Sequence, residues 1–325
     1  MTGETVLEVR DLHTHFFLRR GVVQAVDGVS FSLRRGEVLG LVGESGCGKS
    51  VTALSLLRLL PKDAARTVRG EVVLDGENLL DKSDREMRQI RGQKIAMILQ
   101  DPQTSLNPVF TIGDQLQEAV ARQNGAGRGS VMQRVVDVLR RVKLAAPEQR
   151  IRQYPHQLSG GMKQRVVGAI AISCEPQVMI ADEPTTALDV TIQLQYLQLL
   201  KELQASTDMA MLFITHDFGV VAKMCDRVAV MYAGRIVESG PVREVFDNPA
   251  HPYTQALIAS VPKMRQEVGL LHTIEGQPPA LSDLPEGCRF APRCEFAEAR
   301  CQAAYPDTFH AGEEHSASCW RLADD

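Results

Sequence analysis

The stretch that decides the fold is "GESGCGKS", which spans Gly43 to Ser50 and fits the pattern G-x-x-x-x-G-K-[ST]. Before it, "EVLGLVG" is a short apolar run that ends in glycine and predicts a buried strand. After it, the residues from Ser50 to Leu60 predict a helix that stops at Pro61. A strand, a glycine-rich loop and a helix in this order predict a phosphate-binding loop.

The residue types in this loop suit a nucleoside triphosphate. Its glycines allow backbone N–H groups to turn inward around phosphate oxygens, and the N-terminus of the following helix adds a partial positive charge. Lys49 can neutralise the β- and γ-phosphates, and the Ser50 hydroxyl can bind Mg²⁺. The loop residues predicted to bind ATP are Gly43, Glu44, Ser45, Gly46, Cys47, Gly48, Lys49, Ser50 and Val51.

A pair of acidic residues follows a second apolar run, "QVMIADE". The residues from Val178 to Ala181 predict a buried strand that delivers Asp182 and Glu183 at its carboxyl end, where sheets of this kind bind ligands. Asp182 is predicted to hold Mg²⁺, and Glu183 is placed to polarise an attacking water. Taken alone, the two acids could simply cap a strand, but beside a phosphate-binding loop the catalytic interpretation is favoured.

The remaining patterns predict an α/β fold with a largely parallel sheet. Alternating or apolar runs predict strands over Val22–Leu33, Lys94–Gln100 and Ala210–Asp217, and Asp75-Gly76 predicts a hairpin turn. The residues from about 101 to 172 lack strand runs and predict a helical subdomain.

Composition limits the classes of function. The chain has 325 residues, 44% of them hydrophobic, and a net charge of −4, which argues against a nucleic-acid surface. No apolar run approaches the roughly 20 residues of a membrane span. The N-terminal residues carry early charges and no apolar signal core, which predicts a mature cytosolic protein.

The stretch "QLSGGMKQR", from Gln157 to Arg165, decides between families that share a phosphate-binding loop. It resembles the signature loop, LSGGQ, of the ATP-binding subunits of ABC transporters, with Met162 at the usual glutamine position. The resemblance also predicts a Q-loop glutamine, a D-loop and a switch histidine, and these match Gln100, Asp189 and His216 in the right order. It therefore implies the P-loop fold of an ABC ATPase.

In that family, two ATPase domains pack head to tail around ATP, and the resemblance implies a role for each motif. Ser159, Gly160 and Gly161 would contact the γ-phosphate of the ATP bound to the partner. Gln100 would touch Mg²⁺ and report site occupancy to a transmembrane partner, and His216 would position the water. The family also stacks an aromatic ring on adenine, for which Phe16 and Phe17 are candidates, with Phe17 the choice.

The amino-acid composition changes after about Phe246, where proline and turn residues become frequent. We therefore divide the chain into an ATPase domain, 1–245, and an extension, 246–325. "NPAHPYTQALIASVP", from Asn248 to Pro262, and "IEGQPPALSDLPEGCRFAPRC", from Ile274 to Cys294, resemble the C-terminal extension of oligopeptide/dipeptide importer ATPases. Importers of nickel and some other small solutes share this extension.

This second resemblance implies a function, partners and a location. The chain would hydrolyse ATP to energise the import of peptides. Its partners would be a second ATPase subunit, identical or related, two permease subunits and an extracytoplasmic solute-binding protein, and it would lie on the cytoplasmic face of the membrane. The alternatives are an importer ATPase for nickel or another small solute, and a soluble ABC ATPase that acts on nucleic acid or ribosomes.

Four of the seven cysteines lie in the extension with the spacing C-x₅-C-x₆-C-x₁₇-C: Cys288, Cys294, Cys301 and Cys319. Three interpretations remain open, namely unrelated buried thiols, a structural zinc site and a [4Fe–4S] cluster. Zinc sites often use C-x₂₋₄-C pairs, which this set lacks, whereas clusters tolerate varied spacing. Matching cysteines in the importer branch resemble cluster ligands, so the resemblance implies a [4Fe–4S] cluster with Zn²⁺ as the alternative.

Overall fold

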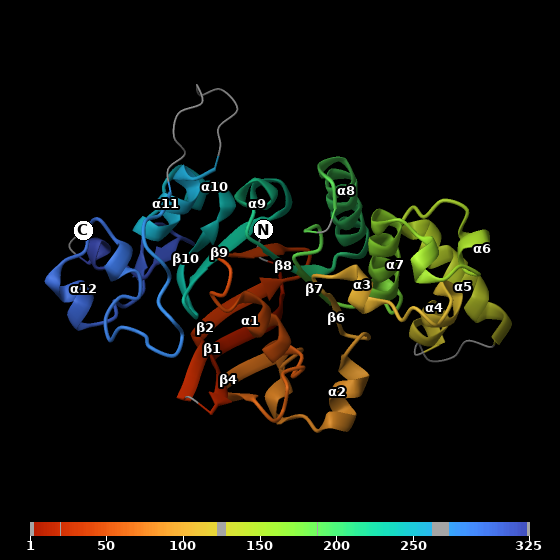
Figure 1. Cartoon of the computed structure of the whole chain (residues 1–325), viewed down its shortest axis with the longest axis horizontal. Coiled ribbons are helices and arrows are strands. Elements are labelled where there is room, and N and C mark those ends of the chain that lie inside the picture. The colour runs from red at the N-terminus through yellow and green to blue at the C-terminus, as the bar shows by residue number, and fades with distance from the viewer. Residues whose placement is uncertain (1–2, 20, 122–127, 187, 262–272, 324–325) are drawn as a thin grey trace. The chain divides into compact units, whose positions relative to one another are not determined.

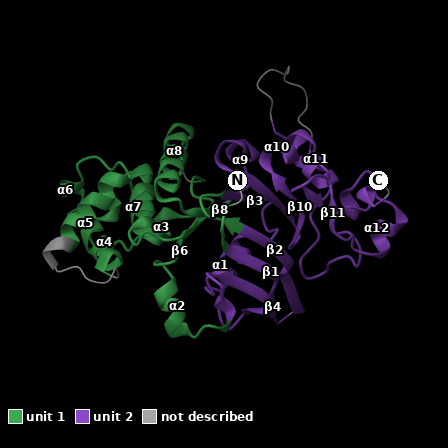
Figure 2. Cartoon of the chain, turned by 180° about the vertical axis from the view of Figure 1, so that it is seen from behind, with its two compact units in different colours: residues 1–6, 33–37, 81–213 green, residues 7–32, 38–80, 214–325 purple. Residues whose placement is uncertain are grey.

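The computed structural model describes residues 3–19, 21–121, 128–186, 188–261 and 273–323 (Figure 1). The chain forms two compact units, each assembled from separate stretches of sequence (Figure 2). Unit 1 contains residues 1–6, 33–37 and 81–213, and unit 2 contains residues 7–32, 38–80 and 214–325.

Unit 2 contains an antiparallel sheet with the strand order β2-β1-β4-β5. Its strands are β1 (Thr5–Leu18), β2 (Gly21–Arg34), β4 (Ala65–Leu74) and β5 (Glu77–Asn78). The predicted hairpin turn is confirmed, since Asp75 and Gly76 both have positive φ and join β4 to β5. The sequence analysis did not predict β1, which alternates buried and less buried residues along most of its length.

Unit 2 also contains the strands β3 (Val38–Val42), β9 (Arg227–Tyr232), β10 (Arg235–Pro241), β12 (Ser316–Ala317) and β11 (Phe309–His310). Here β3 and β9 are parallel, whereas β10 runs antiparallel to both β9 and β12. The helices of this unit are α1 (Lys49–Leu56), α9 (Phe218–Met224), α10 (Val242–Asp247), α11 (Pro252–Ala259) and α12 (Ala299–Ala303). The prediction that the first helix extends to Leu60 is wrong, because Arg58 adopts a positive φ that a helix does not allow.

The core of unit 2 includes residues of the C-terminal extension. Tyr253 of α11 and Phe290 of the loop between α11 and α12 are buried against Tyr232 of β9, with ring centroids 4.5 and 5.4 Å from its ring. Aromatic pairs at these separations add to the stability gained from burial. The extension therefore packs into the same hydrophobic core as β9 and α9.

Unit 1 contains three short strands, of which β6 and β7 are parallel, and most of the described helices. The strands β6 (Ile95–Ile98), β7 (Val178–Asp182) and β8 (Ala210–Thr215) lie in the order β8-β7-β6, with Ile95 beside Val178. The helices are α2 (Asp84–Ile90), α3 (Pro102–Ser105), α4 (Ile112–Ala121), α5 (Arg128–Arg141), α6 (Pro147–Arg150), α7 (Gly160–Ile172) and α8 (Val190–Thr207). Helices α3 to α7 thus occupy the segment predicted to be helical, between β6 and β7.

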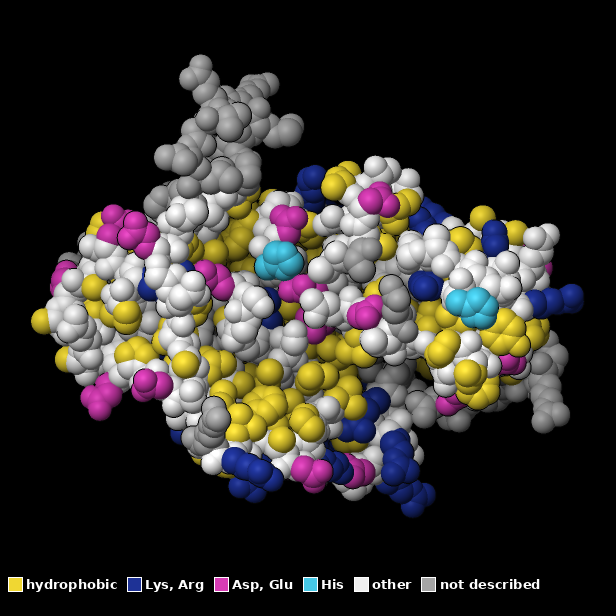
Figure 3. Space-filling model, in the orientation of Figure 1, with side chains coloured by type: hydrophobic (Ala, Val, Ile, Leu, Met, Phe, Trp, Pro, Cys, Tyr) yellow, Lys and Arg dark blue, Asp and Glu magenta, His cyan; other side chains and the backbone are white. Residues whose placement is uncertain are grey.

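The surface carries both signs of charge. On the face drawn in Figure 3, Lys and Arg side chains lie in small groups with Asp and Glu side chains among them. This distribution agrees with the net charge of −4. Within the described residues, no helix combines the length and the apolar composition that a membrane span requires.

Candidate functional site

The glycine-rich loop of unit 2 joins the buried strand β3 to the helix α1, as predicted. Gly43, Gly46 and Gly48 all have positive φ, which glycine adopts without strain. A Cβ atom on Gly43 would lie 2.1 Å from the Met231 carbonyl oxygen, and one on Gly48 would lie 2.3 Å from the Ala25 carbonyl oxygen. The loop is therefore packed so closely against neighbouring backbone that only glycine fits at these two positions.

Lys49 is held inside this loop. Its buried ammonium donates to the carbonyl oxygens of Gly43, at 2.8 Å, and Glu44, at 3.0 Å. The amine is thus fixed beside the carboxyl end of β3, where a phosphate-binding loop needs its positive charge. Ser45, Gly46 and Ser50 are exposed and remain accessible to a ligand, whereas Cys47 is buried, and its burial raises the pKa of the thiol.

Two further predicted residues belong to unit 2. His216 follows β8, is exposed and precedes the helix α9, whose N-terminus is capped by the Asp217 carboxylate. Phe17 lies near the end of β1 with 39% of its surface exposed, and the Arg66 guanidinium carbon lies 4.4 Å from the centroid of its ring. Phe16 is less exposed and pairs with Ala65 across the sheet.

Asp182, Glu183 and Gln100 belong to unit 1, and the structure brings the last two together. Asp182 is buried at the end of β7. Glu183 follows with φ 45°, and its Oε2 accepts hydrogen bonds from Gln100 Nε2 and Thr186 Oγ1, both at 3.0 Å. A non-glycine residue in the left-handed region is uncommon and often marks a functional position. The Glu183 carboxylate is thus held by neighbouring side chains at the end of the strand.

The residues of the predicted signature loop lie at the N-terminus of α7 in unit 1. Ser159 is the N-cap, and its hydroxyl accepts from the Met162 N–H at 3.4 Å. Ser159 and Gly160 are exposed, and no atom lies within 4 Å of the position that a Cβ on Gly160 would occupy. Gln164 of the same helix donates to the Pro184 carbonyl oxygen at 2.7 Å, so α7 is tied to the residue that follows Glu183.

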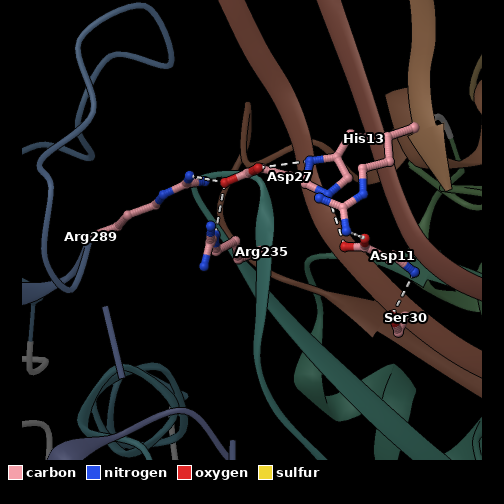
Figure 4. A network of polar contacts seen from close by, with 7 residues as sticks. Asp11, His13, Asp27, Ser30, Arg235 and Arg289 are labelled. Carbon is pink, nitrogen blue, oxygen red and sulfur yellow. Dashed lines mark hydrogen bonds and ion pairs between the residues drawn. The ribbon is translucent and has the colours of Figure 1, made fainter. Parts of the chain in front are cut away.

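A buried carboxylate in unit 2, Asp27, was missed by the sequence analysis (Figure 4). It pairs with Arg289, with Arg235 at 2.8 Å and with His13 Nδ1 at 2.9 Å. Burial alone would raise the pKa of the Asp27 carboxyl, but the neighbouring Arg235 and Arg289 outweigh it and lower the pKa. His13 in turn contacts Asp11, so a chain of polar contacts links the extension to β1 and β2.

The cysteines of the extension line one small pocket together with aromatic side chains such as Phe296 and Trp320. All four are free thiols: Cys288, Cys294, Cys301 and Cys319. Burial raises the pKa of Cys288 to about 11 and also raises those of Cys294 and Cys319. Within the described residues, no group of three or more histidine, cysteine or carboxylate side chains has the geometry of a site for a metal ion. The geometry of the protein alone thus does not support the predicted metal.

A glycine-rich loop between a buried strand and a helix, with an acidic pair at the end of another strand, defines a P-loop nucleotide-binding protein. Comparison with known proteins identifies a family within this class of P-loop proteins. Residues 26–186 match the family model of the ABC transporter, and residues 237–301 match that of the oligopeptide/dipeptide transporter C-terminal region.

Individual relatives align with nearly the whole chain and support the same family. A probable peptide ABC transporter ATP-binding protein of Sinorhizobium fredii is 52% identical and covers 98% of this chain and 96% of its own length. The dipeptide transport ATP-binding protein DppD of Bacillus subtilis is 49% identical, covering 98% and 95%. Among solved structures, the ATP-binding cassette MJ0796 in its dimeric post-hydrolysis state with ADP and Pi has a TM-score of 0.65 at 27% identity, covering 73% of this chain and 99% of that chain.

This chain therefore belongs to the family of ABC transporter ATP-binding proteins, in the branch that carries the oligopeptide/dipeptide C-terminal region. The predicted α/β fold of an ABC ATPase is confirmed. Sequence analysis did not identify Asp27, Arg289 or Arg293 as residues that join the extension to the nucleotide-binding elements. The two arginines stand out in a cysteine- and proline-rich segment of the sequence. Their carboxylate partners, however, lie more than 200 residues away, so the pattern does not reveal them.

Proposed function

We propose that this chain hydrolyses ATP to drive the import of peptides through a membrane permease. The observation that carries the proposal is the match of both parts of the chain, the ATPase core and the C-terminal region, to the corresponding parts of peptide transporters. Relatives described as peptide, dipeptide and oligopeptide transport ATP-binding proteins align with more than nine tenths of the chain.

The site residues have distinct proposed roles. The backbone of the loop from Gly43 to Gly48 and the Lys49 ammonium bind the triphosphate, a role supported by the packed glycines and the fixed amine. Hydroxyl, carboxylate and amide oxygens suit Mg²⁺, and Ser50, Asp182 and Gln100 supply them. Glu183 activates the attacking water.

The remaining motifs act around the reacting γ-phosphate and the adenine ring of ATP. His216 orients the water at the γ-phosphate. Ser159, Gly160 and Gly161 contact ATP bound to a partner ATPase subunit, which the exposure of Ser159 and Gly160 supports. Phe17 is the proposed stacking partner for adenine, in agreement with its exposed ring.

The proposed partners are a second ATPase subunit, identical or related, two permease subunits and an extracytoplasmic solute-binding protein. The chain would then lie at the cytoplasmic face of the membrane as a peripheral subunit. Exposed apolar side chains that follow Gln100 in the sequence support contact with another protein, since Val109 is 71% and Phe110 is 51% exposed. The mixed surface charges in Figure 3 favour this function over binding to nucleic acid.

We also propose that the four cysteines of the extension hold a [4Fe–4S] cluster. The supporting observation is that all four thiols line one pocket and are free. A single Zn²⁺ needs four sulfur atoms at about 2.3 Å from one point, whereas a cluster separates its ligands by its own width. Four thiols around one pocket match the number of thiolate ligands that a cluster requires. When bound, the cluster would crosslink the loops that carry these cysteines.

Transport is the direct test of the function. The chain, assembled with its permease subunits in proteoliposomes, should drive ATP-dependent uptake of labelled di- to pentapeptides, and Lys49→Ala should abolish it. Uptake of Ni²⁺ but not of peptides would assign the chain to the nickel alternative. ATP hydrolysis that never depends on the permease would contradict the proposal.

Metal analysis tests the cysteine site. Anaerobically purified chain should be brown, absorb broadly near ~400 nm and contain about four irons. Stoichiometric zinc in a colourless protein would contradict the cluster and support the alternative metal. A folded, active protein with neither metal would contradict both.

A further inference from the structure

Arg293 of the C-terminal extension reaches the phosphate-binding loop within unit 2. Its two terminal nitrogens donate to the two carboxylate oxygens of Glu44, at 2.7 and 3.1 Å. The same guanidinium donates to the Tyr232 hydroxyl at 3.3 Å and to the backbone oxygens of Ile274, at 3.3 Å, and Glu275, at 2.9 Å. Only 4% of the Arg293 side chain and 27% of the Glu44 side chain are exposed, so the pair is partly shielded from water.

Glu44 is held at three points. Its side chain binds Arg293, its backbone N–H donates to the Tyr253 hydroxyl at 2.9 Å, and its carbonyl oxygen accepts from Lys49 Nζ at 3.0 Å. Two of these three partners, Arg293 and Tyr253, lie beyond residue 246. Residues outside the ATPase core thus help to set the conformation of Glu44, the second residue of the phosphate-binding loop.

The charge of Glu44 makes this contact important for nucleotide binding. A carboxylate in a phosphate-binding loop repels a triphosphate, and repulsion at such short range is weakly screened where the groups are partly buried. A bidentate arginine neutralises a carboxylate through two charge-assisted hydrogen bonds, which are stronger than hydrogen bonds between neutral groups. Removal of one member of such a pair leaves the other charge uncompensated.

Arg293 is itself held firmly. It ends the short 3₁₀ turn Ala291–Arg293, which lies between Cys288 and Cys294. Phe290, directly before that turn, is buried in the aromatic core with Tyr232 and Tyr253. The packing of the extension therefore presents the guanidinium to Glu44 in a defined position.

We infer that Arg293 is a positioning residue of the nucleotide site: it neutralises Glu44 and fixes the phosphate-binding loop, so that the C-terminal extension contributes directly to ATP affinity. The inference rests on the proposed function, because it assumes that the loop from Gly43 to Ser50 binds ATP.

Binding of ATP to the complete chain tests the inference through a double-mutant cycle. Arg293→Ala should weaken ATP binding about tenfold, since it leaves an unpaired carboxylate at the loop. Glu44→Gln alone should bind ATP at least as tightly as the wild type. The combination of both changes should restore the affinity to within about threefold of the wild type, because the repelling charge is gone.

Two further variants complete the experiment. Arg300→Ala removes an arginine of the same extension that pairs with Glu298, and it should leave ATP affinity unchanged. Arg293→Lys keeps the charge but not the bidentate geometry, and it should recover part of the lost affinity. In the assembled complex, Arg293→Ala should raise KM for ATP and leave kcat within about twofold.

The outcomes separate this inference from the proposed function. Wild-type ATP affinity in Arg293→Ala would overturn the inference, as would a double variant that binds as weakly as Arg293→Ala, since the loss would then come from general damage to the loop. Lys49→Ala is measured alongside. If it binds ATP like the wild type, the assignment of the phosphate site itself is wrong, whatever Arg293→Ala does.

Discussion

Glu183 and Gln100 are the best-defined pair of predicted site residues at the scale of single side chains. One oxygen of Glu183 accepts two hydrogen bonds, from Gln100 and Thr186, while the residue keeps a positive φ. These two hydrogen bonds hold the carboxylate in place. A carboxylate held in this way can orient and polarise a water molecule.

Glu183→Gln is expected to bind ATP with unchanged affinity and to hydrolyse it ~10²–10⁴-fold more slowly, because an amide cannot polarise water as a carboxylate does. The measurements are ATP binding to the purified chain and turnover in the assembled complex. Glu175→Gln, which changes an exposed glutamate paired with Arg141, is the control and should keep full turnover. Turnover of Glu183→Gln near that of the wild type would contradict the assignment.

At the scale of elements, the loop between β3 and α1 shows how backbone packing limits a binding motif. Gly46 and Gly48 both have positive φ, but only Gly48 lies against another backbone segment, at the Ala25 carbonyl oxygen. The two glycines therefore allow the cost of conformational strain to be separated from the cost of a steric clash.

Gly48→Ala should lower the thermal midpoint of the nucleotide-free chain more than Gly46→Ala does. Strain at a positive φ costs about 1 kcal/mol for alanine at either position, whereas the clash at Gly48 adds further cost of about 1–3 kcal/mol. Differential scanning fluorimetry of both variants without nucleotide measures the difference. Equal midpoints would mean that the loop can move away from Ala25.

The helix α11 begins at a histidine that cannot easily be protonated. His251 is buried, its ring Nδ1 accepts from the Tyr253 N–H at 3.0 Å, and its backbone N–H donates to the Glu238 carboxylate at 2.9 Å. Burial lowers the pKa of His251 to about 3. Because the ring of the unfolded chain has a pKa near ~6.5, the unfolded state takes up a proton at a pH at which the folded state does not.

His251 should therefore make the chain less stable as pH falls below about 6.5, by up to about 1.4 kcal/mol per pH unit, and contribute no pH dependence above it. His251→Asn keeps an N-cap acceptor but does not titrate, so its loss of stability between pH 7 and 5 should be smaller by about 2 kcal/mol. Urea unfolding at both pH values measures this. The exposed His310→Asn is the control, and an equal slope in wild type and His251→Asn would refute the prediction.

At the scale of the whole molecule, the C-terminal extension is part of the nucleotide-binding unit rather than an appendage. Glu238 on β10 is buried and accepts from the Ala250 N–H, the His251 N–H and His315 Nε2, at 2.8, 2.9 and 2.7 Å. The strand β12 then pairs with β10. These contacts join the extension to β10, and Arg293 joins it directly to the phosphate-binding loop.

The proposed head-to-tail pairing of two ATPase subunits gives a prediction about assembly. Ser159→Arg in a Glu183→Gln background should still bind ATP as a monomer, but it should not form the ATP-dependent dimer, because a long cation would occupy the exposed signature loop. Size-exclusion chromatography with and without ATP is the measurement. Ser159→Asn retains a capping side chain and controls for loss of the N-cap, which costs about 1 kcal/mol. Loss of ATP binding by the monomer would contradict a role across the interface.

The linear sequence by itself determined the class of fold and the order of the motifs. Short-range patterns carry this information: an apolar run before "GESGCGKS", another before Asp182, and a turn at Asp75-Gly76 each define local backbone structure. The strand β1 carries a similar alternation and was open to the same reasoning. Its irregular register, with bulges near His13, made the period harder to recognise.

Only the tertiary structure decided which distant residues complete the site. Arg293 meets Glu44 across 249 residues of sequence, and Arg289 meets Asp27 across 262. Ion pairs of this kind leave no periodic trace, because either partner is an ordinary charged residue in its own segment. Burial selects them: once Phe290 and Tyr253 enter the core beside Tyr232, the neighbouring arginines lose water and must find carboxylates. The phosphate-binding loop could therefore be predicted from the sequence, whereas its contact with the C-terminal extension could not.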